Sequence, residues 1–254
     1  MKFICLHGSY GSAANFQVQL APFIDAVEKN SSTKFQWING FHEVDAPRGF
    51  DDYFGAPPLY KFIDHDGNNA LNDFAEGLRN FKSGESPAES MRMFAASQEL
   101  LAASTTQNAI KKLLDLIAED PEIEGILGYS EGAMMAATLI MEEKRRFEEE
   151  GIPRRIKCGV FFAGWPPVRL VGDKIKSLLY DECDDVLDIP TCHIVGCKDP
   201  YIHGALALYE VSDPDSAELF DHGKGHTVPR DPKTINELAD SICHAVSRSR
   251  AIAV

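Results

Sequence analysis

A serine flanked by two glycines stands where an apolar run gives way to a run of small residues. Within residues 126–136, Gly128, Ser130 and Gly132 form the pattern G-x-S-x-G. This pattern is typical of a tight turn from a strand into a helix, which exposes the serine hydroxyl as a nucleophile. The glycines are required because a Cβ at either position would collide with the neighbouring strand or helix. The pattern also occurs by chance, so a base, an acid and an oxyanion donor are needed to support it.

A histidine in the last part of the chain is the candidate base for this serine. Residues 221–229 contain His222 and His226 in a glycine-rich setting. His226 is expected in the loop between the last predicted strand and the closing helix, where a catalytic histidine can reach the serine. His222 is expected at the end of the strand, either fixed by packing or exposed.

Asp199 is the candidate for the carboxylate that orients the base. It follows a strand-like run and lies in a turn at residues 196–200. Pro200 disfavours helical φ/ψ at Asp199, which places this residue in a loop before a helix. A helix N-cap is the alternative role, because aspartate is common there. The chain order Ser130, Asp199, His226 is that of the α/β-hydrolases, and it favours the catalytic role.

Two backbone amides are the candidate donors to the negative charge that develops on a substrate carbonyl. One is the amide of Glu131, which follows the serine at the start of a predicted helix. The other is expected from the loop after the first strand, with Ser9 as the donor and Tyr10 as the alternative. His7 is expected to support this loop. The Glu131 side chain is expected to be stabilised by the helix N-terminus rather than to react.

Short apolar runs alternate with longer amphipathic ones through most of the chain. Strands are predicted at residues 3–6, 34–38, 125–129, 156–163, 189–195 and 217–220. Helices are predicted, from apolar residues at helical spacing, at residues 12–29, 98–118, 132–150 and 231–247. This alternation predicts an α/β-hydrolase fold with a mostly parallel sheet covered by helices on both faces.

Residues 39–96 interrupt the alternation. The segment is rich in proline and glycine, and it carries the aromatic residues Phe50, Tyr53, Phe54, Tyr60, Phe62, Phe74 and Phe81. A long irregular segment in a compact domain is usually functional or disordered, and the aromatic content argues against disorder. We expect one domain over residues 1–254, with residues 39–96 as a cap or pocket wall. A packed insertion without a role at the site is the alternative.

The composition excludes several classes of partner. The 254 residues carry a formal net charge of −14, so no excess of basic residues is available for nucleic acid or an anionic membrane. Neither a signal peptide nor a membrane-spanning run is found, and a cytoplasmic location is expected. The six cysteines are scattered and are expected to be buried, reduced thiols. No metal site is expected, because His222 and His226 lack a second pair of ligands.

Four segments resemble the fungal-type serine hydrolases, a family that includes the human ovarian-cancer-associated serine hydrolase. They are residues 6–12, 128–132, 196–200 and 225–230. Within that family the chain is most similar to thioesterases that release polyketide acyl chains, such as the lovastatin-type releasing enzymes. The residues that carry this narrower resemblance are 35–41, 57–60 and 164–167. Asn39 departs from the aspartate expected at its position.

The resemblance implies acyl transfer to water through an acyl-serine intermediate, without a cofactor. We expect a thioesterase that releases a polyketide acyl chain from an acyl carrier domain. A broad carboxylesterase for small soluble esters and a non-catalytic binder of a small molecule are the alternatives. A basic cluster would suit an acidic carrier, but complementing the C-terminal end of a helix is the preferred explanation. The cluster comprises Lys144, Arg145, Arg146, Arg154, Arg155 and Lys157.

Overall fold

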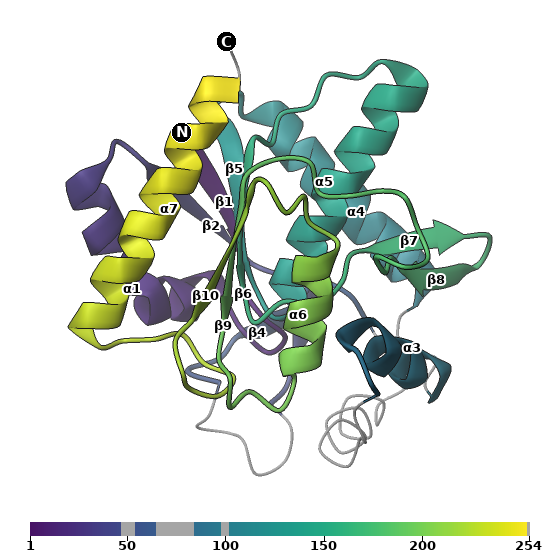
Figure 1. Ribbon diagram of the computed structural model, residues 1–254, viewed down its shortest axis with the longest axis horizontal. Coiled ribbons are helices and arrows are strands. Elements are labelled where there is room, and N and C mark those ends of the chain that lie inside the picture. The colour runs from purple at the N-terminus through teal and green to yellow at the C-terminus, as the bar shows by residue number, and fades with distance from the viewer. Residues whose placement is uncertain (47–53, 65–83, 98–101, 253–254) are drawn as a thin grey trace.

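A six-stranded parallel sheet forms the centre of the protein (Figure 1). The computed structural model describes residues 1–46, 54–64, 84–97 and 102–252, and the statements below concern these residues. The strand order is β10-β9-β6-β5-β1-β2, and every neighbouring pair is parallel. The strands are β1 (Lys2–Leu6), β2 (Lys34–Ile38), β5 (Ile123–Tyr129), β6 (Cys158–Phe162), β9 (Thr191–Val195) and β10 (Ala217–Asp221). The predicted parallel sheet is confirmed.

Helices cover both faces of the sheet, with α1 and α7 on one face and α4 and α5 on the other. Their bounds are α1 (Ala13–Asn30), α4 (Ala103–Glu119), α5 (Glu131–Glu150) and α7 (Pro232–Ile252). In β1, Phe3 and Cys5 belong to the core under α1 and α7, whereas Ile4 and Leu6 belong to the core under α4 and α5. Successive side chains of a strand point to opposite faces, so an all-apolar strand needs cover on both.

Two antiparallel strand pairs and one helix of the described residues lie outside the predicted elements. They are β3 (His42–Val44) with β4 (Leu59–Lys61), β7 (Val168–Val171) with β8 (Lys174–Ser177), and α3 (Pro87–Ser97). The helix expected after Asp199 is α6 (Ile202–Glu210). Strands of three or four residues carry too little alternation to be recognised in a sequence. α3 packs against α6, and the two strand pairs form small sheets separate from the main sheet.

Helix α4 begins later than the spacing predicts. The predicted helix starts at residue 98, and residues 98–101 lie outside the described part of the chain. Ala102 is extended, with φ −69° and ψ 116°, and its amide donates to the carbonyl of Asp64 at 3.4 Å. That contact ties the backbone before the helix to the segment after β4. The helix therefore starts at Ala103.

Parts of the segment 39–96 lie against the loop that follows β1. The Tyr60 amide donates to the Gly11 carbonyl at 2.7 Å. The Gly40 amide donates to His7 Nε2 at 2.8 Å. Both contacts bring the segment to the loop that the sequence assigns to the oxyanion donor.

Much of the same segment lies outside the described part of the chain. This holds for residues 47–53 and 65–83, which include Phe50, Tyr53, Phe74 and Phe81. A cap formed by residues 39–96, and a single domain over residues 1–254, therefore stay predictions.

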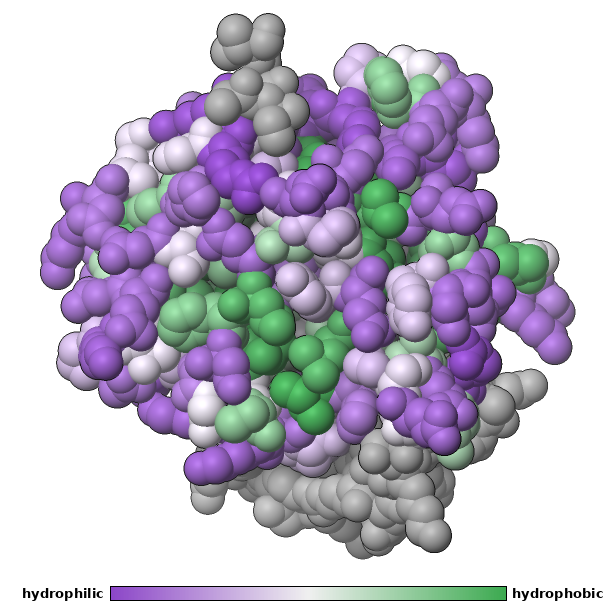
Figure 2. Space-filling view, in the orientation of Figure 1, coloured by the Kyte–Doolittle hydropathy of each residue, from purple (hydrophilic) through white to green (hydrophobic). Residues whose placement is uncertain are grey.

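Apolar side chains gather in the middle of the face seen in Figure 2, over β10 and α6, and polar side chains surround them. β10 is an edge strand of the sheet, and its Leu219 is 44 % exposed. Among the described residues, no helix is both long enough and apolar enough to span a bilayer.

The cysteines are all free thiols. Cys5, Cys158 and Cys192 are buried in the sheet, whereas Cys197 is exposed. Burial raises the pKa of the Cys158 thiol to about 12, so this side chain is uncharged and acts as a small apolar residue. The exposed Cys197 departs from the expectation that the thiols are buried.

Candidate active site

The candidate nucleophile lies in a strained turn between β5 and α5. Ser130 has φ 54° and ψ −116°, a conformation that residues with a Cβ rarely adopt. Its amide donates to the Phe162 carbonyl of β6 at 2.9 Å. A Cβ on Gly128 would lie 2.3 Å from the Gly132 carbonyl oxygen, and one on Gly132 would lie 2.2 Å from that of Leu6. The tight strand-to-helix turn predicted from the two glycines is therefore present.

Asp199 and His226 form a hydrogen-bonded pair. His226 Nδ1 lies 2.7 Å from Asp199 Oδ2. The Asp199 side chain is 2 % exposed, whereas that of His226 is 20 % exposed. Asp199 Oδ1 accepts the Tyr201 amide at 2.8 Å, at the start of α6. One oxygen thus faces the histidine and the other accepts the amide of Tyr201, the residue before α6. The contact with His226 fits the orienting role, whereas the N-cap of α6 is Tyr201 and not Asp199.

Two tyrosine rings flank the His226 imidazole. The ring centroids of Tyr129 and Tyr201 lie 5.3 Å and 4.9 Å from that of His226. Tyr129 Oη also donates to the His226 carbonyl at 3.2 Å, and Tyr129 directly precedes Ser130, so the imidazole lies beside the turn. Within the described residues no hydrogen bond joins Ser130 to His226. Such bonds often tighten only when substrate binds.

The loop after β1 approaches the nucleophile at Gly8. A Cβ on Gly8 would lie 3.2 Å from the Cβ of Ser130. A turn follows, in which Tyr10 has a φ of 60°. In the part of the chain that the structure describes, the amides of Ser9, Tyr10 and Glu131 have no hydrogen-bond partner. Both candidate donors of this loop therefore have an N–H group that an oxyanion can use.

His7 is a buried support of the same loop. Its Nδ1 lies 2.7 Å from the Gly8 carbonyl oxygen, and its Nε2 accepts the Gly40 amide at 2.8 Å. Because Nε2 accepts, the proton belongs on Nδ1, which donates to Gly8. Burial lowers the pKa of His7 to about 4, so the ring is neutral near pH 7. His7 thereby fixes the loop to the chain between β2 and β3.

The Glu131 side chain has a place at the site that the sequence does not indicate. It is buried, and its Oε2 accepts the Ser9 hydroxyl at 2.8 Å. Its Oε1 accepts the Ile63 amide at 3.0 Å, across 68 positions of the chain. No local pattern predicts these partners, since each lies far from Glu131 in sequence.

His222 stands apart from the Asp199–His226 pair. It follows β10, and its amide donates to the Val195 carbonyl at 2.9 Å. Its Nδ1 accepts the Lys224 amide at 3.3 Å. Partial burial lowers the pKa of His222. The ring is held at the end of the strand, where the sequence predicts it.

The basic cluster of residues 144–157 is mostly paired with carboxylates of this chain. The ion pairs are Lys144–Asp188, Arg145–Glu142, Arg146–Glu142, Arg154–Asp188 and Lys157–Glu124. The remaining member, Arg155, donates to the Ala118 carbonyl at 3.5 Å. The cluster therefore presents much less free positive charge than its sequence indicates.

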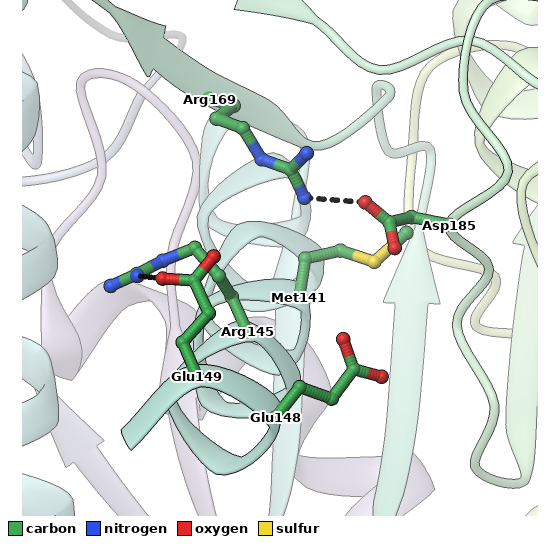
Figure 3. A pocket seen from close by; sticks show the side chains of 6 residues that line it. All are labelled: Met141, Arg145, Glu148, Glu149, Arg169 and Asp185. Atoms are coloured by element: carbon green, nitrogen blue, oxygen red, sulfur yellow. Dashed lines mark hydrogen bonds and ion pairs between the residues drawn. The ribbon is translucent and has the colours of Figure 1, made fainter.

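A polar cleft of about 270 Å³ lies toward the C-terminal end of α5, away from the turn at its start. Its lining residues are Met141, Arg145, Glu148, Glu149, Arg169 and Asp185. Figure 3 shows Arg145 turned to Glu149 and Arg169 turned to Asp185, the latter at 2.7 Å. The two cations are thus paired with neighbouring carboxylates, and none of Ser130, Asp199 and His226 lines this cleft.

The profile of the family described as "Serine hydrolase (FSH1)" matches residues 1–238. The chain belongs to this family. Among its relatives, Hydrolase phiM of Talaromyces stipitatus is 26 % identical over 94 % of this chain and 84 % of its own length. Esterase FPY3 of Fusarium mangiferae is 26 % identical over 98 % of both chains. Esterase citA of Monascus ruber is 31 % identical over 98 % of this chain and 94 % of its own. This serine hydrolase is therefore an enzyme that acts on esters.

Solved structures share the fold of this serine hydrolase. The Bacillus cereus carboxylesterase matches with a TM-score of 0.56 and 14 % identity, over 96 % of this chain and 87 % of that one. SOBER1 of Arabidopsis thaliana matches with a TM-score of 0.55 and 16 % identity, over 97 % and 99 %. At these identities the likeness concerns the fold alone, which is the α/β-hydrolase fold predicted from the sequence.

Proposed function

We propose that this serine hydrolase is a thioesterase that releases a polyketide acyl chain from an acyl carrier domain. The hydrolytic part rests on one observation: His226 Nδ1 lies 2.7 Å from the buried Asp199 carboxylate, beside the strained turn at Ser130. The choice of substrate rests on the resemblance to polyketide-releasing thioesterases in residues 35–41, 57–60 and 164–167.

Catalysis passes through an acyl-serine intermediate. Ser130 Oγ attacks the carbonyl carbon, and its proton moves to His226 Nε2 because Asp199 engages Nδ1. The amides of Ser9 and Glu131 bind the negative oxygen. The carbon–sulfur bond breaks, and the leaving thiolate takes the proton from His226. A water molecule then gives a proton to His226 and its oxygen to the acyl carbon, and Ser130 regains its proton as the acid leaves.

Two aromatic rings near the imidazole are consistent with an apolar acyl group. The Tyr201 ring centroid lies 4.9 Å from that of His226, and the Trp165 ring centroid lies 6.4 Å from that of Tyr201. Phe94 of α3 is buried and packs against Trp165, with the ring centroids 5.4 Å apart. Apolar rings favour burial of a long acyl chain far more than of an acetyl group. Trp165 also belongs to residues 164–167, which carry the resemblance.

Contact with a carrier domain has support from the resemblance alone. Most cations of the basic cluster at residues 144–157 are paired within this chain, so we assign no docking surface to it. The same catalytic groups act on oxygen esters and thioesters. A thiolate leaves readily, however, and needs little acid assistance.

Turnover of two substrate series tests the substrate class. Acyl-thioesters of N-acetylcysteamine with chains of increasing length are compared with short nitrophenyl esters, by kcat/KM. We expect kcat/KM to rise with chain length in the thioester series and to exceed the value for the short esters. A large preference for the short esters would contradict the thioesterase proposal.

A broad carboxylesterase is the second candidate, favoured by the names of relatives such as Esterase FPY3 and Esterase citA. A preference for short esters in the same assay would support it. A fluorophosphonate probe that labels the wild type but not Ser130→Ala would identify Ser130 as the nucleophile for either substrate class.

A further inference from the structure

The Glu131 side chain joins the two residues whose amides are proposed to bind the oxyanion. Ser9 Oγ donates to Glu131 Oε2 at 2.8 Å, although the residues are 122 positions apart. We propose that Glu131 is a positioning residue, whose buried carboxylate holds the Ser9 amide and its own amide at the spacing that an oxyanion requires. The inference rests on the proposed hydrolytic function and adds to it a residue that acts through others.

The second carboxylate oxygen connects a third segment to the same point. Glu131 Oε1 accepts the Ile63 amide at 3.0 Å, shortly after β4. The neighbouring Phe62 ring lies 4.8 Å from the ring of His7, which bonds to the same loop. The loop after β1 is therefore held by two buried side chains, those of His7 and of Glu131, which directly follows Ser130.

The cost of burying the Glu131 carboxylate indicates that this side chain acts by positioning its neighbours. Glu131 is 7 % exposed, and burial raises the pKa of its carboxyl. Hydrogen bonds from Ser9 and Ile63 and the charge of Lys61 offset that cost, because an unpaired buried carboxylate would be strongly destabilising. A negative charge near an oxyanion also opposes the charge that develops there. The carboxylate therefore contributes through the position of its partners and not through its charge.

Two substitutions separate geometry from charge. In Glu131→Gln, the amide oxygen can still accept from Ile63 and the amide nitrogen can donate to the Ser9 hydroxyl. Glu131→Ala removes both links. We expect Glu131→Gln to keep kcat within about threefold, and Glu131→Ala to lower kcat about 10- to 100-fold with little change in KM.

A double-mutant cycle tests the link to Ser9. Ser9→Ala removes the hydroxyl but keeps the amide, so it should lower kcat in the same direction as Glu131→Ala. If the two side chains act as a unit, Ser9→Ala has little further effect in the Glu131→Ala background. The affinity for a trifluoromethyl ketone should fall by the same factor as kcat, because the ketone adduct uses the same amides.

Glu143 provides a matched control on the same helix. Its buried carboxylate accepts the Arg155 amide at 3.2 Å and the Ile156 amide at 2.9 Å, far along α5 from the turn. Glu143→Ala should lower the melting temperature and leave the kcat of the folded protein unchanged. An equal loss of kcat in Glu143→Ala and Glu131→Ala would mean that Glu131 only supports the fold, and would overturn the inference.

Failure of the inference and failure of the proposed function give different results. If Ser130→Ala abolishes turnover while Glu131→Ala keeps the wild-type kcat, the positioning role is wrong and the hydrolytic function stands. If Ser130→Ala turns over normally, the hydrolytic function is wrong and the inference falls with it. Should Glu131→Ala not fold, Ser9→Ala decides, because it leaves the Ile63 contact in place. A wild-type kcat in Ser9→Ala would overturn the inference.

Discussion

His226 Nδ1 and Asp199 Oδ2 lie 2.7 Å apart. Because Asp199 engages Nδ1, the other ring nitrogen, Nε2, is the one that can accept a proton. In Asp199→Asn the side-chain oxygen can still accept the Tyr201 amide, while the NH₂ group faces Nδ1. That group donates, so the ring proton moves to Nε2 and the histidine can no longer act as a base. We expect kcat to fall about 10⁴-fold.

The melting temperature of Asp199→Asn provides the control. Because the hydrogen bond from the Tyr201 amide is kept, the variant should melt close to the wild type in circular dichroism. A kcat within tenfold of the wild type would contradict the role of Asp199.

Two substitutions at Ser130 separate its chemistry from its strain. Both Ser130→Ala and Ser130→Gly remove the nucleophile, so each should lower kcat by several orders of magnitude. Glycine adopts φ 54° without strain, whereas alanine keeps the strain. Since such strain costs about 1–3 kcal/mol, more than glycine loses in chain entropy, Ser130→Gly should have the higher melting temperature. The reverse order would mean that the turn stores little strain.

A substitution at Gly132, two residues after the nucleophile, tests the close approach of α5 to β1. A Cβ on Gly132 would lie 2.2 Å from the Leu6 carbonyl oxygen, so Gly132→Ala should destabilise the fold by about 3 kcal/mol or more. Gly225→Ala is the control, because the nearest atom to its Cβ would be the Lys198 carbonyl oxygen at 3.7 Å. Urea unfolding measures both. Equal stability of the two variants would contradict the close contact.

Two buried histidines should make the protein less stable in acid. Burial lowers the pKa of His7 to about 4 and that of His193 to about 3, from an ordinary value of 6.5. As pH falls from 6.5 towards 4, the unfolded chain binds protons that the folded chain does not, so the free energy of unfolding falls. The contribution is complete above pH 6.5, and for His7 it amounts to about 3 kcal/mol.

Urea unfolding between pH 7 and 4.5 measures this loss. His193→Gln removes one of the two titrating groups, so its free energy of unfolding should depend less steeply on pH, by about 1.4 kcal/mol per pH unit near pH 5. An unchanged slope would mean that His193 is not buried in its neutral form.

The main layers of the fold could be predicted because their signals are local. The runs at residues 34–38 and 189–195 are strand-like on their own, and Ser12 marks the start of α1 by accepting the Asn15 amide at 3.1 Å. The turn at Ser130 could also be predicted, because a turn this crowded requires glycine on both sides of the serine.

The remaining features depend on contacts between distant positions. The partner of Glu131 at Ile63 is 68 positions away and is a backbone amide, which any residue type supplies. The pairing of the basic cluster cannot be predicted for the same reason: Asp188 and Glu124, which pair with Arg154 and Lys157, lie 34 and 33 positions from them. A sequence pattern does not show which distant residues form such pairs.

The parallel sheet also determines where a tag, a second domain or a solid support can be joined to the enzyme. Ser130, Asp199 and His226 all follow the carboxyl ends of strands, β5, β9 and β10. The start of β1 and the end of α7 lie toward the other ends of the strands (Figure 1). A tag, a fused domain or a surface linker joined at either end of this chain would therefore lie away from Ser130, Asp199 and His226.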